Sequence, residues 1–200
     1  MLAANQHVLI LASASPRRQE LLRGAGIAFE VHPAHIAEER LAHEAPRAYA
    51  CRLAQEKAQA VAVKFPGRFV LGADTIVVAG HGNDVLEKPR DAADAARMLR
   101  LLSGRGHEVT TAVSLVSPEG AADTRCATTE VFFRKLQEQE IERYVAGGEP
   151  MDKAGAYAIQ GGAGPWVQRI EGEYSNVVGL PLSLVMKILR SRGLVAKVGN

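Results

Sequence analysis

The sequence predicts an α/β protein with a mixed β-sheet. Three observations lead to this fold class. Short β-like apolar runs alternate with segments of helical periodicity along the chain. Residues 69–79 are almost continuously apolar, which is typical of a strand buried on both faces. Residues 109–116 and 124–133 alternate like antiparallel strands, and a mixture of hairpins and crossover helices indicates a mixed sheet.

The expected elements follow one another without a repeat, a low-complexity tract or a Pro/Ser-rich linker, so residues 1–200 are predicted to form a single domain. In chain order they are a strand at 7–12, a helix at 15–24, a strand at 27–31, a helix at 46–64, strands at 69–79 and 85–86, a helix at 91–102, strands at 109–116 and 124–133, a helix at 137–145, strands at 157–160 and 166–170, and a helix at 181–192.

The ends of the predicted helices are marked by residues that favour helix starts and stops. Ser15 is a good N-cap, and Pro16 suits the first helical position. Asp91 plays the same capping part for the helix at 91–102, and glycines follow several helices. The helix at 46–64 should face inward along Tyr49, Leu53, Ala60 and Val61, and Pro66-Gly67 should stop it.

Turn residues connect the predicted strands. Residues 80–83 should turn the chain back to the strand at 85–86, and residues 117–120 should close the long hairpin. The glycine-rich bend at 161–164 lacks the G-x-G-x-x-G spacing, so it is interpreted as a flexible bend that lets backbone approach a ligand. Trp166 is expected in the core.

Composition excludes several classes of protein. The chain has 200 residues, of which 47% are hydrophobic and 23% charged, as in an average globular domain. Its apolar runs are far shorter than the roughly 20 residues that a membrane-spanning helix needs, and residues 1–12 have no cationic start, so a cytoplasmic protein is expected. The net charge of +2 is too balanced for electrostatic binding of nucleic acid. Cys51 and Cys126 are far apart and are expected to be buried free thiols.

The first predicted helix begins with two arginines, although helix starts favour acidic residues. Arg17 and Arg18 stand beside the free N–H groups of the helix start and beside the hydroxyls of Ser13 and Ser15, which together suit the oxygens of a phosphate. In the alternative interpretation both arginines point to solvent and Ser15 is an ordinary cap. No G-x-x-x-x-G-K-[ST] string is present, so this is not a P-loop NTPase.

Asp74 is a carboxylate within the apolar strand at 69–79. An unpaired buried charge is costly, so such a group pairs with cations or a metal, or becomes neutral, and either outcome is typical of a functional site. Alternatively, Gly72 could start a bulge that turns Asp74 outward.

Three lysines could supply the cations. Lys57 lies on the inward stripe of its helix, and Lys88 and Lys153 lie in loops beside strands. For Lys57, snorkelling of the ammonium group to solvent is the alternative. His32 and His35 have metal-ligand spacing, but Pro33 disfavours a helix there and a third ligand is not evident, so a surface loop is expected.

Residues 11–18, 72–75, 87–89, 152–161 and 179–181 resemble the motifs of the Maf family of nucleoside triphosphate pyrophosphatases, in its dTTP/UTP branch. The resemblance covers almost the whole chain. It implies a twisted mixed sheet flanked by helices, with two lobes around a deep cleft as in Maf and ITPase-like proteins. It also implies a cytoplasmic, often homodimeric enzyme that uses Mg²⁺ or Mn²⁺ to convert a nucleoside triphosphate to its monophosphate and pyrophosphate.

The resemblance also implies roles for single residues. Asp74 matches the proton acceptor, and Arg17, Thr75 and Gln160 match positions linked to substrate selection. Glu38 matches a metal-binding acid, although the adjacent Glu39 could be confused with it. Ala158 stands where a glycine is frequent, which affects only the fine shape of the base pocket.

We therefore expect Asp74 to orient and deprotonate a water molecule that attacks the α-phosphorus, with the metal held by Glu38 and Asp74. Thr75 and Gln160 would read a pyrimidine edge. The residues expected to bind the rest of the substrate are Ser13, Arg17, Arg18, Lys57, Lys88 and Lys153. Two alternatives stay open: the same chemistry on a modified purine triphosphate, and a non-catalytic nucleotide-binding regulator of cell division.

Overall fold

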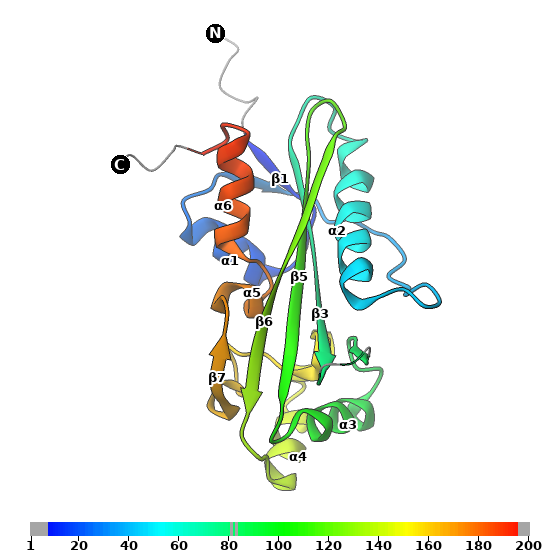
Figure 1. Ribbon diagram of the computed structural model, residues 1–200, viewed down its shortest axis with the longest axis vertical. Coiled ribbons are helices and arrows are strands. Elements are labelled where there is room, and N and C mark those ends of the chain that lie inside the picture. Colours follow the sequence, from blue (N-terminus) through cyan, green and yellow to red (C-terminus); the bar gives the residue numbers. More distant parts are fainter. Residues whose placement is uncertain (1–7, 81, 83, 196–200) are drawn as a thin grey trace. The chain divides into compact units, whose positions relative to one another are not determined.

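A computed structural model describes residues 8–80, 82 and 84–195, which form both helices and strands (Figure 1). In order they are β1 (Leu9–Leu11), α1 (Pro16–Gly24), β2 (Phe29–Val31), α2 (Pro46–Ala62), β3 (Val70–Ala79), β4 (Val85–Leu86), α3 (Ala92–Leu102), β5 (Gly106–Val116), β6 (Ala122–Phe133), α4 (Glu138–Ala146), the short 3₁₀ helices η1 (Glu149–Asp152), η2 (Ala154–Ala156) and η3 (Gly164–Trp166), β7 (Val167–Glu171), α5 (Tyr174–Val178) and α6 (Leu182–Ser191).

The described strands form a seven-stranded mixed sheet, which confirms the predicted fold class. The strand order is β2-β1-β3-β5-β6-β7, and β4 pairs with β3 outside this path. β1 is parallel to both β2 and β3, whereas β4 is antiparallel to β3 and β7 is antiparallel to β6. The parallel part of the sheet is joined by helices, as βαβ connections require.

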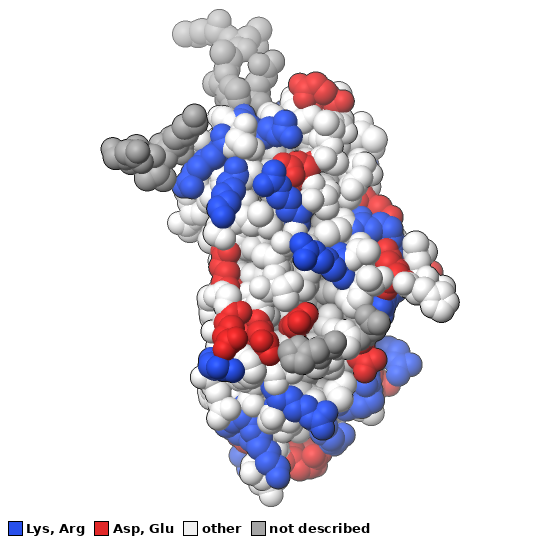
Figure 2. Space-filling model, in the orientation of Figure 1, with Lys and Arg blue, Asp and Glu red and all other residues white. Residues whose placement is uncertain are grey.

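The chain divides into two compact units. The first contains the described parts of Met1–Asp74, Thr111–Ala127 and Gly179–Asn200, and the second contains the described parts of Thr75–Thr110 and Thr128–Val178. β3 passes from the first unit to the second after Asp74, and β5 and β6 also contribute residues to both. On the face drawn in Figure 2, basic and acidic side chains are interleaved.

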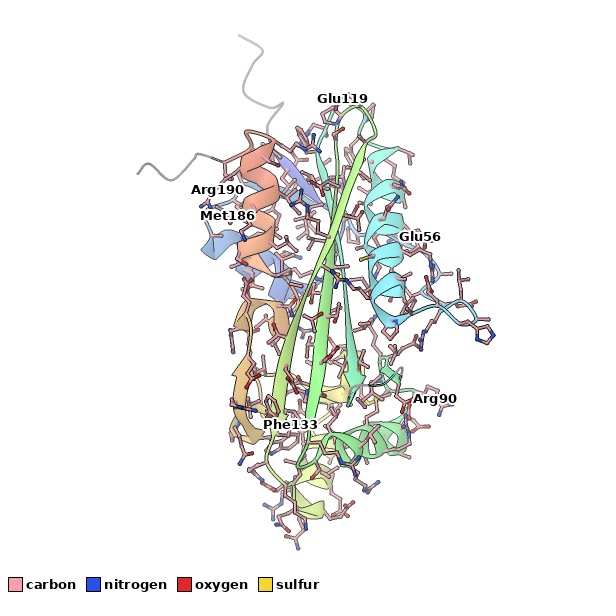
Figure 3. The ribbon with its side chains drawn as sticks, viewed as in Figure 1. Glu56, Arg90, Glu119, Phe133, Met186 and Arg190 are labelled. Carbon is pink, nitrogen blue, oxygen red and sulfur yellow. The ribbon has the colours of Figure 1, made fainter. Side chains whose placement is uncertain are left out.

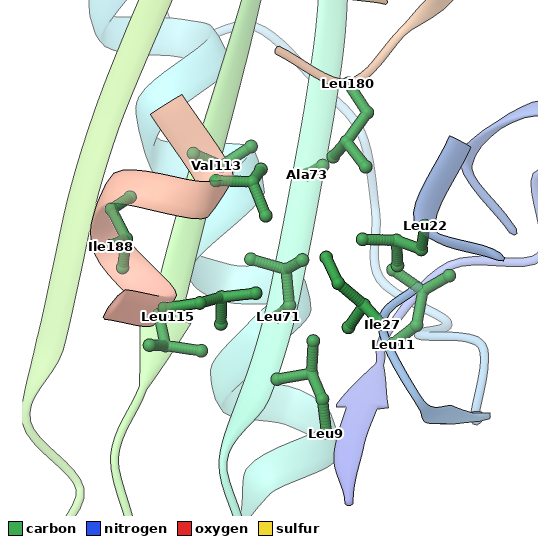
Figure 4. Close-up of a cluster of buried hydrophobic side chains, with 12 residues drawn as sticks. Leu9, Leu11, Leu22, Ile27, Leu71, Ala73, Val113, Leu115, Leu180 and Ile188 are labelled. Carbon is green, nitrogen blue, oxygen red and sulfur yellow. The ribbon is translucent and has the colours of Figure 1, made fainter. Parts of the chain in front are cut away.

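The first unit buries both faces of its strands. Leu9, Leu11 and Leu71 pack with Leu22 of α1 and Ile188 of α6 in one apolar cluster (Figure 4). The alternate residues Ile10 and Val70 point the other way and pack with Ala58 and Val61 of α2. Side chains of a strand alternate between its faces, so β1 and β3 need helices on both sides. This confirms the interpretation of residues 69–79 as a strand buried on both faces.

The second unit contains an aromatic cluster. Phe133 of β6, labelled in Figure 3, lies 4.8 Å from the Tyr157 ring and 6.1 Å from the Trp166 ring, measured between centroids. His107 packs on Phe133 with the ring centroids 4.9 Å apart. Trp166 is 4% exposed and its ring also contacts Tyr144, so the predicted core position of Trp166 is confirmed.

One strand prediction was wrong, another strand begins one residue later than predicted, and the 3₁₀ helices η1, η2 and η3 were not predicted. Residues 157–160, predicted as a strand, form no strand, because their backbone makes local turns and binds side chains: Gly161 N–H donates to Ala158 O. Trp166 ends η3, so the last strand starts at Val167. The short helix α5 was not predicted. Residue 7 of the first predicted strand and residues 81 and 83 of the predicted turn lie outside the described residues.

Candidate active site

The loop between β1 and α1 carries the first group of candidate residues. Ser15 has extended backbone angles, and its Oγ accepts the Arg18 N–H at 3.5 Å, which confirms it as the N-cap of α1. Ser13 is buried. Its Oγ accepts the Ser15 N–H at 3.2 Å and the Arg18 Nη1 at 3.2 Å. The serine hydroxyls therefore shape the turn as well as facing the start of α1.

Arg18 points inward, so the interpretation that both arginines point to solvent was wrong for this residue. Its Nε donates to Gly179 O at 2.8 Å, and its Nη1 donates to Ala73 O at 3.0 Å. Burial lowers the pKa of Arg18, and the charge of Arg17 lowers it further, while Asp74 and Glu38 act in the opposite direction. Arg18 thus ties the start of α1 to β3 and to the segment before α6, with carboxylates and a second guanidinium nearby.

Gly72 allows α2 to lie directly against β3. A Cβ atom at this position would stand 2.3 Å from Ala54 O and 2.7 Å from Ala58 N, so no other residue fits without moving the helix. Ala54 and Ala58 flank Lys57 on α2, and their own small side chains help the close approach. Gly72 is therefore needed for the close approach of the α2 backbone to β3. The alternative of a bulge that turns Asp74 outward was wrong, because Asp74 is only 6% exposed.

Lys57 joins two carboxylates. Its Nζ lies 2.7 Å from Asp74 Oδ1 and 2.7 Å from Glu38 Oε1. Lys57 is 8% exposed, so the snorkelling alternative was wrong and the predicted inward position is confirmed. An ammonium group carries three donors, so it can hold both acids at once. Of the two adjacent glutamates in the loop before α2, Glu38 is the one whose carboxylate contacts Lys57.

The first unit therefore brings together most of the expected phosphate and acid groups. Within it Ser13 contacts Arg18, and Lys57 contacts both acids, while the pKa of Arg18 responds to Arg17, Glu38 and Asp74. These side chains come from the β1–α1 loop, the first turn of α1, the loop before α2, α2 itself and β3. Such mixing of cations, acids and a helix N-terminus suits an anionic ligand.

The two carboxylates also bear on the metal prediction. The described residues contain no cluster of three or more His, Cys, Asp and Glu side chains that could hold a metal ion by themselves. Glu38 and Asp74 nevertheless both contact one cationic group, Lys57 Nζ. Mg²⁺ is commonly bound by one or two carboxylates together with substrate phosphates and water. The donor set fits a metal that arrives with, or is completed by, a polyphosphate.

Four other predicted site residues belong to the second unit. Thr75 follows Asp74 on β3, Lys88 is exposed after β4, and Gln160 is exposed in the turn after η2. Lys153 Nζ donates to Glu149 O and to Asp152 Oδ1, both at 2.6 Å.

One backbone contact joins two of these loops in the second unit. Gly155 N–H donates to Glu87 O at 3.2 Å, so the loop of Lys88 and the loop of Lys153 lie side by side. Gly155 also packs against Val77, because a Cβ on it would lie 2.9 Å from Val77 Cγ2.

Sequence reasoning missed some features. The backbone carbonyls of Gly179 and Ala73 orient Arg18. Every residue has such a carbonyl, so the sequence does not indicate which ones accept a hydrogen bond from a side chain. Cys51 and Cys126 are free thiols, as expected, but the prediction that they are buried was wrong, because both are half-buried. Their side chains hydrogen-bond to each other. Burial, together with Cys126, raises the pKa of Cys51 to about 11. Their facing positions follow only from the packing of α2 on β6.

A family model described as "Maf-like protein" matches residues 8–192. This chain belongs to the Maf family. The Maf chain is 56% identical over 187 residues to a protein of Koribacter versatilis named "dTTP/UTP pyrophosphatase", with 94% of this chain and 95% of the relative covered. A protein of Citrifermentans bemidjiense with the same name is 52% identical over 193 residues, covering 96% and 97%.

Comparison with solved structures agrees on the fold of this Maf protein. The structure of the Staphylococcus aureus Ham1 protein matches with a TM-score of 0.50 and 14% identity, covering 92% of this chain and 98% of that one. At this identity the similarity shows a shared α/β fold and nothing about activity. Among the described residues of the Maf chain, no helix is long and apolar enough to cross a bilayer.

Proposed function

We propose that this Maf protein hydrolyses dTTP and UTP, and modified pyrimidine triphosphates, to the nucleoside monophosphate and pyrophosphate. Relatives that are 56% and 52% identical over nearly their whole length carry the name dTTP/UTP pyrophosphatase. The observation in this chain that supports the proposal most is Lys57 bound to both Asp74 and Glu38, beside Arg18 and Ser13. This grouping offers a proton acceptor and phosphate-binding cations in one unit.

Asp74 is the proposed proton acceptor. An oxygen of water attacks the α-phosphorus, the bond from that phosphorus to the α–β bridging oxygen breaks, and pyrophosphate leaves with the bond electrons. The proton of the attacking water moves to the Asp74 carboxylate. Lys57 fixes the direction of that carboxylate through its 2.7 Å contact with Oδ1, which leaves Oδ2 to face the water.

The cations neutralise the triphosphate. Arg17 and Arg18 present guanidinium groups at the start of α1, where backbone N–H groups also favour phosphate oxygens. A divalent ion, Mg²⁺ or Mn²⁺, held by Glu38 and Asp74 would supply further charge neutralisation on the phosphate oxygens when bound. Thr75 and Gln160 contact the pyrimidine base of the nucleotide in this proposal. The other residues that complete substrate binding are Ser13, Lys57, Lys88 and Lys153.

The remaining expectations belong to the same proposal. Residues 1–200 work as one catalytic domain, the enzyme acts in the cytoplasm, and it forms a homodimer. Its partner is the nucleoside triphosphate rather than a nucleic acid or a membrane.

A nucleotide panel tests the proposal. Purified protein is incubated with dTTP, UTP, CTP, dATP, GTP and inosine triphosphate, with Mg²⁺, with Mn²⁺ or with chelator, and products are separated by ion exchange. The proposal requires pyrophosphate and monophosphate from dTTP and UTP. Release of orthophosphate with a diphosphate product contradicts the α-phosphorus as target. Preference for inosine triphosphate favours the modified-purine alternative, and binding without turnover under every metal condition favours a non-catalytic regulator.

A further inference from the structure

One carboxylate holds both ends of the turn that carries Gln160. Glu149 Oε2 accepts the Gly162 N–H at 3.2 Å, and Glu149 Oε1 accepts the Tyr144 hydroxyl at 3.0 Å. The same Tyr144 oxygen accepts the Ala158 N–H at 3.0 Å. Residues 158 and 162 are thus both fixed to Glu149, one directly and one through Tyr144.

The turn lies directly on this carboxylate. A Cβ atom on Gly161 would stand 1.9 Å from Glu149 Oε1, and one on Gly162 would stand 3.2 Å from the Tyr144 ring. A side chain on Gly161 would therefore displace the Glu149 carboxylate, and one on Gly162 would press on the Tyr144 ring. These close contacts explain the glycine-rich sequence after Gln160, which sequence reasoning interpreted only as a flexible bend.

These contacts hold the backbone in place of the hydrogen bonds that a strand would make within a sheet. Residues 157–160 form no strand, so sheet hydrogen bonds do not fix their backbone. A hydrogen bond to an ionised acceptor is roughly twice as strong as a neutral one, which makes Glu149 an effective anchor. Gln160 itself is exposed, so the place of its amide depends on the place of the backbone that carries it.

We propose that Glu149 is a positioning residue for base selection: through Tyr144 and Gly162 it holds the turn at 158–162 so that the Gln160 amide meets a 4-oxo pyrimidine. The inference rests on the proposed function, because it takes Gln160 as a base-reading residue. Its ligand class is the uracil or thymine nucleotide, whose 4-oxo group accepts a hydrogen bond where the 4-amino group of cytosine donates one.

Glu149→Ala tests the inference, with Glu149→Gln as the conservative variant and Glu142→Ala, an exposed acid of α4, as the matched control. Glu149→Ala keeps the Glu149 carbonyl that binds Lys153, so only the carboxylate is lost. For dTTP and UTP we expect KM to rise about tenfold, the effect of losing a hydrogen bond to a charged group, with kcat nearly unchanged and discrimination against CTP reduced. Glutamine can accept from Gly162 N–H and donate to Tyr144, so it should restore most of the loss.

Hydrogen exchange gives a readout that does not need substrate. The Ala158 and Gly162 amides should exchange faster in Glu149→Ala and not in Glu142→Ala. Unchanged KM together with unchanged exchange overturns the inference, as does a fall in kcat with unchanged KM. If Glu149→Ala does not fold, Tyr144→Phe, which removes only the hydroxyl, must show the same rise in KM and in Ala158 exchange, and wild-type behaviour there overturns the inference. A wild-type protein that hydrolyses no nucleotide refutes the proposed function, while the exchange measurement still decides whether Glu149 holds the turn.

Discussion

Lys57 Nζ and Asp74 Oδ1 are 2.7 Å apart, and the two residues are only 8% and 6% exposed. Removing one partner of a buried ion pair leaves the other charge without compensation. Lys57→Met should therefore lower the free energy of unfolding by about 3 kcal/mol and abolish most activity. Urea denaturation followed by circular dichroism measures the loss, with Lys64→Met, an exposed lysine just beyond α2, as control. Equal stability of the two variants would show that the pair contributes nothing.

Gly72 sets the distance between α2 and β3. Gly72→Ala places a methyl group where Ala54 O and Ala58 N already stand, so α2 must shift together with Lys57. Overpacking of this kind costs about 1–3 kcal/mol, and we expect activity to fall along with the midpoint of urea unfolding. Gly24→Ala is the matched control, because a Cβ there has no neighbour within 4 Å. If both variants behave like the parent, the close approach of α2 has no functional consequence.

Burial lowers the pKa of His107 to about 4 from an ordinary value of 6.5. Between these values the unfolded chain binds a proton that the folded chain does not, so the stability contributed by neutral His107 is lost as the pH falls from 6.5 towards 4. The loss amounts to about 3 kcal/mol at the acid end of this window. Urea unfolding measured at several pH values should show a shallower decline in His107→Gln than in the parent. An identical decline in both proteins would rule out His107 as its source, and His35→Gln, at an exposed site, should change nothing.

The raised pKa of Cys51 predicts that its thiol is alkylated slowly at neutral pH. Because the thiolate is the reactive form and the pKa is about 11, burial and the contact with Cys126 should suppress alkylation at neutral pH. Mass spectrometry after timed iodoacetamide treatment should show modification of Cys51 that accelerates up to about pH 11. Cys126→Ser removes the neighbouring thiol and should shift this profile to lower pH, although burial, the larger cause, remains. Complete alkylation of Cys51 within minutes at pH 7 would contradict the structure.

The central residues of the site could be predicted because each breaks a pattern. Asp74 is a charge on an apolar strand, and Lys57 is a charge on the apolar stripe of a helix, so the sequence alone indicates that both are buried and need charged partners. Glu38 lies in an irregular loop, where the sequence shows no helical or strand periodicity of apolar residues. Only the resemblance of the sequence to the Maf family indicated it as a site residue. The bonds from Arg18 to backbone carbonyls depend on tertiary packing and could not be predicted.

The errors in the fold have a similar cause. Residues 157–160 have the composition of a strand, but the Ala158 N–H donates to the Tyr144 hydroxyl and the Ala158 carbonyl accepts the Gly161 N–H of a turn. When a side chain from another element accepts a backbone N–H, the local sequence gives no indication of that hydrogen bond. The same holds for Glu149, whose neighbours in the chain give no indication that it binds the turn at 158–162.

The most direct test of the account is the turnover of Asp74→Asn with dTTP, measured beside nucleotide binding by calorimetry and beside Asp84→Asn, an exposed acid, as control. Loss of the proton acceptor should reduce kcat by about 10²- to 10⁴-fold while dTTP still binds and Asp84→Asn keeps full activity. A kcat within twofold of the parent would contradict the assignment of Asp74 as the group that receives the proton.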